Sequence, residues 1–101
     1  MNIPVSFYLK RRKWTVELVS EDMIIDGVNC RGHCDPDMRL IEIRDNLSSK
    51  VMVETFVHEF LHAVEHEYNL KIAHKLIYVL EKPLAYMVRL LLESNLEAEA
   101  A

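Results

Sequence analysis

The fold of this chain is decided by one stretch, VETFVHEFLHAV at residues 53–64. Its apolar residues recur every three or four positions, which is the period of a helix with one face against a core. We expect this helix to run from about residue 49 to 68, with Ser48 or Ser49 accepting hydrogen bonds from its free N–H groups. Asn69 suits the left-handed conformation that ends a helix.

The same stretch contains the motif H-E-x-x-H, formed by His58, Glu59 and His62. Positions i and i+4 of a helix lie one above the other, about 6 Å apart, so two imidazoles there can bind one metal ion. Zinc held in this way keeps coordination positions open, and Glu59 beside it can act as general base on a bound water. The alternative is a chance match on an ordinary amphipathic helix of a helical interaction protein.

Two histidines leave a catalytic zinc one protein ligand short of the usual three. The candidates for the third ligand are His66, His74 and Glu81. His66 lies eight residues from His58, about 12 Å along the same helix, so the two cannot easily share one ion. We therefore expect His66 to be a surface residue or a supporting residue near the site.

The other two candidates are separated by assuming that the two helices form an antiparallel hairpin. In that register Glu81 faces the gap between His58 and His62, whereas His74 falls about 9 Å too far along. Glu81 also lies in a strongly apolar stretch, where a carboxylate is costly unless it is paired or bound to a metal. We expect Glu81 to be the third ligand, and its alternative role is a solvated charge beside Lys82.

A second helix is predicted from about residue 73 to 94, with a kink at Pro83. Residues 84–92 are apolar nearly all round, which indicates burial or a homodimer interface. Tyr78 lies one turn before Glu81 on the same face, where it can donate to an oxyanion or simply pack between helices.

The first half of the chain predicts strands at residues 3–9, 14–19, 23–25 and 39–44. Apolar and polar residues alternate at 14–19 and 39–44, residues 3–9 are apolar and rich in aromatics, and 23–25 is a short apolar run that ends at a turn signal. The segment CRGHCDP at 30–36 predicts a turn, since a metal site built from its cysteines lacks the usual second ligand pair. The expected fold class is α+β, with a small sheet of three or four strands packed on the motif helix and the kinked second helix.

The chain has 101 residues, of which half are hydrophobic and 28% charged, with a net charge of −4. These values are ordinary for one globular domain, which we place at residues 1–95, with a frayed tail at 96–101. No apolar run reaches the length of a membrane span, and the N-terminus has no export signal, so we expect a cytoplasmic protein with reduced Cys30 and Cys34. The basic run at 10–13 predicts a solvated turn rather than a nucleic-acid site.

The motif with its surroundings resembles small zinc-metallopeptidase-like proteins of phages and prophages, which are similar to minimal gluzincins. The matching residues are HEFLHA at 58–63, EYNL at 67–70, His74 and Leu80-Glu81, and the resemblance covers roughly residues 14 to 92. It implies a zincin-like domain that hydrolyses peptide (amide) bonds with zinc on His58, His62 and Glu81, and with Glu59 as base.

The resemblance also implies a peptide or protein substrate that adds to an edge strand of the sheet, and the strand at 38–44 is the candidate edge. The chain departs from larger members because no helix precedes its sheet. A rival function is a metal-stabilised binding or regulatory module with little or no turnover, which the small size favours.

Overall fold

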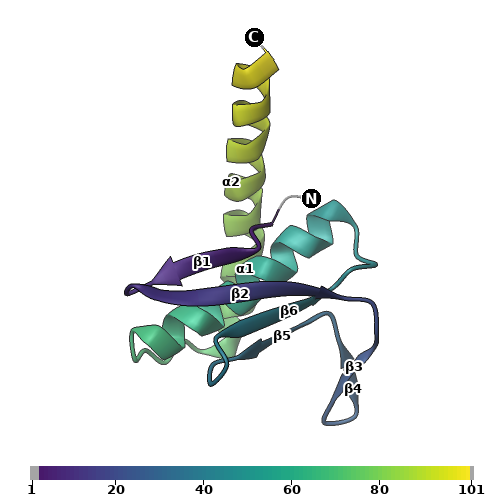
Figure 1. Ribbon diagram of the computed structural model, residues 1–101, viewed down its shortest axis with the longest axis vertical. Helices are drawn as coiled ribbons and strands as arrows, with labels where there is room; N and C mark the ends of the chain where they lie inside the picture. The colour runs from purple at the N-terminus through teal and green to yellow at the C-terminus, as the bar shows by residue number, and fades with distance from the viewer. Residues whose placement is uncertain (1–2, 101) are drawn as a thin grey trace.

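Four strands form a mixed sheet, helix α1 lies against it, and helix α2 crosses α1 on the side away from the sheet (Figure 1). The computed structural model describes residues 3–100, with side chains up to Glu93. The sheet has the order β1-β2-β6-β5, and a separate two-stranded ribbon pairs β3 with β4. The bounds are β1 (Ser6–Leu9), β2 (Arg12–Val19), β3 (Met23–Ile25), β4 (Val28–Cys30), β5 (Gly32–Asp35), β6 (Leu40–Arg44), α1 (Ser49–Glu67) and α2 (His74–Ala100). The predicted α+β class is confirmed.

The sheet begins with a hairpin whose turn is the basic run. Lys10 and Arg11 have positive φ angles of 49° and 65°, so they form the two-residue turn that joins β1 to β2. β2 then pairs in parallel with β6, and β6 pairs on its other side with β5 in antiparallel register. The prediction that the strand at 38–44 is an edge is therefore wrong, because β6 lies inside the sheet.

The edge beside β6 is β5, in a segment predicted as a turn. Gly32 pairs with Ile43 and Asp35 pairs with Leu40, so the four residues between Arg31 and Pro36 form a strand. The prediction failed because a four-residue strand is too short to show alternation, whereas Gly32 and Pro36 are typical of turns. Asp35 does help to form a turn, since its Oδ1 accepts from the backbone N–H of Asp37 at 3.1 Å.

Helix α1 is packed on two sides. Met52 and Ala63 lie in the cluster that contains the buried sheet residues Trp14, Ile41 and Ile43. On the other side, Val53 and Val57 pack with Ala85 of α2. The apolar stripe seen in the sequence is thus shared between the sheet and the second helix, and a third side of α1 is left to carry polar groups.

Both ends of α1 are fixed by hydrogen bonds. Ser48 caps the start, because its side chain accepts from the N–H of Val51 at 3.3 Å. At the end of the helix the carboxylate of Glu67, only 3% exposed, accepts from Nε1 of Trp14 at 3.1 Å and from Nε of Arg39 at 2.5 Å. Arg39 lies between β5 and β6, so this carboxylate ties the last turn of α1 to the sheet.

Helix α2 is longer than the sequence predicts. It passes Pro83 as one continuous helix and extends to Ala100, rather than ending near residue 94. Its first half contains the buried Ile77 and Ala85, which are 0% and 1% exposed, and Ala85 packs on α1. Its second half stands clear of the sheet (Figure 1). Over the described residues, neither helix combines the length and the apolar character that crossing a membrane requires.

Candidate metal centre

The two motif histidines lie side by side on the third side of α1. The Nε2 atoms of His58 and His62 are 3.3 Å apart, and the ring centroids are separated by 5.0 Å. Both rings are partly exposed, with side-chain exposures of 13% and 30%. The i, i+4 pairing predicted from the motif is present.

His74, the first residue of α2, joins this pair. Its Nε2 lies 3.2 Å from Nε2 of His58, and ligand atoms of His58, His62 and His74 all lie within 4.8 Å of one another. Among the described residues this is the group of histidine, cysteine and acidic side chains that could hold a metal ion. The prediction that His74 falls about 9 Å too far along is therefore wrong.

The segment between the helices explains why His74 reaches the site. Residues 70–73 have no regular secondary structure, and an extended residue advances about 3.3 Å, against 1.5 Å in a helix. The segment runs back along α1, because the N–H of Leu70 donates to the carbonyl of Glu65 at 2.8 Å and that of Ile72 donates to Oε2 of Glu65 at 2.9 Å. The chain thus runs back beside α1 after its last turn, and His74 begins α2 next to His58.

Each motif histidine is hydrogen-bonded to a carboxylate through its Nδ1 atom, on the ring edge opposite Nε2. Nδ1–H of His58 donates to Oε2 of Glu81 at 2.6 Å, and Nδ1–H of His62 donates to Oε1 of Glu65 at 2.8 Å. A carboxylate only accepts, so Nδ1 is the donor in each pair, and in the neutral form of each ring Nε2 then has the lone pair that can bind a metal. Glu81 is therefore beside the site, as predicted, but it contacts His58 on the ring edge away from the converging Nε2 atoms.

Glu65 has a double role in this arrangement. One oxygen accepts from His62, and the other accepts from the backbone of Ile72, two residues before His74. The side chain of Glu65 thus orients His62 and also fixes the segment that leads to His74. The sequence shows Glu65 on the same face as the motif but gives no signal for its contact with Ile72.

Glu59 is buried beneath the edge strand. It is 7% exposed, and burial, with a smaller contribution from the nearby charge of Glu81, raises its pKa to about 7. Gly32 of β5 lies directly over it, since a Cβ at that position would meet Oε2 of Glu59 at 3.2 Å and Cγ2 of Thr55 at 2.7 Å. The close approach of β5 therefore requires glycine and excludes water from one side of Glu59.

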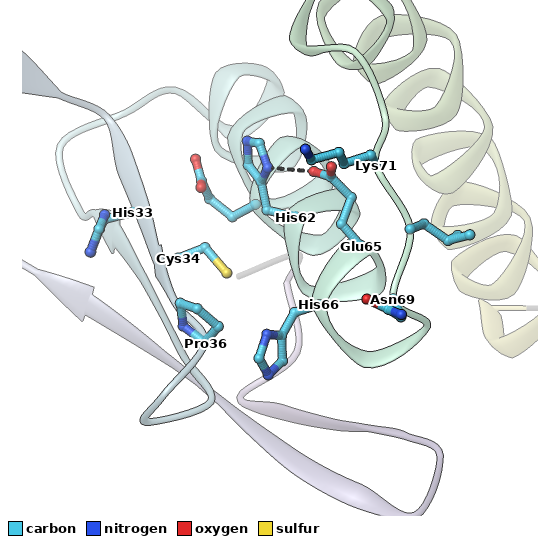
Figure 2. A pocket seen from close by; sticks show the side chains of 10 residues that line it. His33, Cys34, Pro36, His62, Glu65, His66, Asn69 and Lys71 are labelled. Carbon is cyan, nitrogen blue, oxygen red and sulfur yellow. Dashed lines mark hydrogen bonds and ion pairs between the residues drawn. The ribbon is translucent and has the colours of Figure 1, made fainter.

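A pocket of about 590 Å³ opens between β5 and α1, and Figure 2 shows its lining. The lining residues come from β5 and the turn after it, from α1 and from the segment that follows α1: His33, Cys34, Pro36, Glu59, His62, Glu65, His66, Asn69, Leu70 and Lys71. The sulfur of Cys34 points into the pocket (Figure 2), and burial raises the pKa of this thiol to about 12, so it stays protonated. The pocket connects the edge strand with Glu59 and His62.

Two further residues named by the sequence lie around the centre. The ring of Tyr78 packs against His58 and His74, with centroid distances of 5.0 and 4.7 Å, and the residue is 56% exposed. His66 is exposed, lies with its ring edge-to-face on Trp14 at 6.2 Å and is outside the ligand group, in agreement with its expected surface position.

Comparison of the chain with protein-family models, curated proteins and solved structures finds no match.

Proposed function

We propose that this protein is a zinc-dependent metallopeptidase whose metal is held by Nε2 of His58, His62 and His74. The observation that carries the proposal is the 3.3 Å approach of Nε2 of His58 to Nε2 of His62, while Nδ1 of each ring contacts a carboxylate. In the tautomer with hydrogen on Nδ1 both Nε2 atoms are acceptors, and two acceptors at that distance repel unless a cation lies between them. Zinc–nitrogen bonds of about 2.0–2.1 Å in a tetrahedron separate nitrogens by about 3.3 Å, close to the observed 3.2 and 3.3 Å.

The donor set favours zinc over harder cations, because imidazole nitrogens suit zinc whereas magnesium and calcium prefer oxygen. When bound, zinc polarises a carbonyl and lowers the pKa of a coordinated water. Glu81 and Glu65 orient the rings and keep their Nε2 atoms basic, in the manner of carboxylate–histidine–zinc arrangements. The third ligand of this proposal, His74, differs from the gluzincin pattern, in which a glutamate such as Glu81 binds the metal directly.

Glu59 supplies the general base. A carboxyl group with a pKa of about 7 is half ionised near neutral pH, which suits a residue that must both take and return a proton. It lines the same pocket as His62, so a water in that pocket can reach both groups. Tyr78, whose ring packs on His58 and His74, is the proposed donor to the oxyanion.

The substrate that fits this arrangement is an extended peptide. β5 is an edge strand and its residues line the pocket, so a peptide that pairs with β5 passes over Glu59 and His62. This role falls to β5 rather than to the strand at 38–44. Our proposal keeps the zincin-like architecture expected from the resemblance, with β5 in place of the strand at 38–44 as the edge and His74 in place of Glu81 as the third ligand.

The experiment that tests the proposal compares the wild-type protein with Glu59→Gln. The amide keeps the shape of Glu59 but cannot take a proton, so zinc should stay bound while hydrolysis of a peptide library falls by at least about 100-fold. Zinc is measured by elemental analysis and cleavage by mass spectrometry. Glu54→Gln, the same change five residues earlier in α1, is the control and should leave both unchanged. Loss of zinc in Glu59→Gln would contradict the role assigned to Glu59.

The second candidate is a metal-stabilised binding module. It is favoured by the placement of the ligands on both helices, since one ion on His58, His62 and His74 ties α1 to the start of α2. A wild-type protein that binds zinc, loses thermal stability when the metal is removed and cleaves no peptide in the library has this second function. A protein that binds no transition metal has neither function.

A further inference from the structure

Helix α2 has a large apolar surface that no described part of the chain covers. Between Leu84 and Leu91, six apolar side chains are 36–61% exposed: Leu84, Tyr86, Met87, Val88, Leu90 and Leu91. In this part of α2 only Ala85 is fully buried, against Val53 and Val57 of α1, and the helix beyond it stands clear of the sheet (Figure 1). Exposed apolar side chains gathered on one stretch of a helix are typical of an interaction surface.

The distribution of charges along α2 indicates which partner could bind this surface. Lys75, Lys82 and Arg89 follow one another at intervals of seven residues, so they lie along one side of the helix. The only acidic residue within that span is Glu81, and its carboxylate is bound to His58. The helix then becomes acidic with Glu93, and the sequence continues with two further glutamates and no cation.

The basic part of α2 therefore matches the acidic part of a second α2 that runs in the opposite direction. We propose that α2 binds α2 of a second copy of this chain in antiparallel orientation, with Glu93 of each copy opposite Lys82 of the other. That register places the two-fold axis between Met87 and Val88, in the middle of the exposed apolar residues. A parallel pair sets the basic half of one helix against the basic half of the other.

An antiparallel pair of α2 helices also leaves room for the sheet and α1 of each copy. The sheet and α1 of each copy lie beside the first half of its α2, where Ala85 packs on Val53 and Val57 of α1. In an antiparallel pair these parts of the two copies therefore lie at opposite ends, and residues 82–93 of each helix cover those of the other. The proposal does not depend on the metal or on peptide hydrolysis, because the contact surface is formed by residues 82–93.

Analytical ultracentrifugation of the full chain tests the pairing. The wild-type protein should sediment as a dimer of 11.8 kDa subunits at micromolar concentration. Leu90 lies on the side of α2 toward Lys82 and Glu93, so Leu90→Glu puts a charge into the contact and should weaken dimerisation about 30-fold or more. Ile24→Glu is the control, because Ile24 is an exposed apolar residue, at 61%, on the β3–β4 ribbon, and this change should leave the dimer intact. Circular dichroism shows that each variant is folded.

Charge reversal tests the orientation. Lys82→Glu and Glu93→Lys should each weaken the dimer several-fold, and the double variant should regain wild-type affinity, because the pair is then reversed but still complementary. A wild-type protein that remains a monomer up to millimolar concentration would overturn the proposal, as would a dimer that Leu90→Glu leaves unchanged. A double variant as weak as the singles would refute the antiparallel register. A monomer that binds vesicles of anionic lipid would assign the surface to a membrane instead.

Discussion

His74→Ala should remove the metal far more completely than Glu81→Gln. His74 offers its Nε2 at 3.2 Å from that of His58, whereas Glu81 accepts from Nδ1 on the far edge of the same ring. Zinc bound by four protein ligands has about 10–16 kcal/mol of binding free energy, so one ligand contributes about 3 kcal/mol. Since 1.4 kcal/mol is a factor of ten, losing His74 should raise the zinc Kd by at least about 100-fold.

Glu81→Gln keeps a carbonyl oxygen that still accepts from His58, so only the charge of the hydrogen bond is lost. Supporting partners of this kind change metal affinity by about 10- to 100-fold, and a shape-conserving amide belongs at the lower end of that range. Competition with a chromophoric chelator measures both Kd values on the same protein preparation. His66→Ala is the control, because His66 is exposed and lies outside the ligand group.

The opposite ranking would refute this reasoning. If Glu81→Gln empties the site while His74→Ala keeps it, the carboxylate of Glu81 binds the metal directly, and the hairpin register predicted from the sequence gives the correct ligand. If His66→Ala lowers the affinity as much as His74→Ala, the ligand set of the proposal is incomplete.

Three further predictions concern the surroundings of the centre. Glu65→Gln cannot accept both of the hydrogen bonds that this carboxylate receives, so trypsin should cut the metal-free chain after Lys71 roughly two- to tenfold faster, as measured by mass spectrometry. Burial raises the pKa of Glu59 from about 4.5 to about 7, so its contribution to the stability of the metal-free protein falls as pH rises through 7, by about 3 kcal/mol in all. Urea unfolding between pH 4 and 8 should show this loss in the wild-type protein and not in Glu59→Gln. Gly32→Ala places a Cβ 2.7 Å from Cγ2 of Thr55 and should cost about 1–3 kcal/mol in urea unfolding, and adding Thr55→Ser should restore part of it.

The sequence by itself determined the helix that carries the motif. Residues 49–67 form it because apolar positions recur at helical spacing and Ser48 supplies the cap. The same period brings His58 and His62 together, since an i, i+4 pair needs no information from the rest of the chain. The α+β class also followed from local patterns, because alternating strands precede the helices.

Only the tertiary structure decided which further groups meet that pair. The segment at 70–73 is not helical and is bonded back to Glu65 of α1, so His74 returns to the centre. Glu81 contacts Nδ1 of His58, on the ring edge away from His74. The edge strand β5 was hidden for a similar reason, because four residues beside Gly32 and Pro36 have no local pattern that separates a strand from a turn. Helical contacts depend on spacing within one segment, whereas these contacts depend on where the chain reverses.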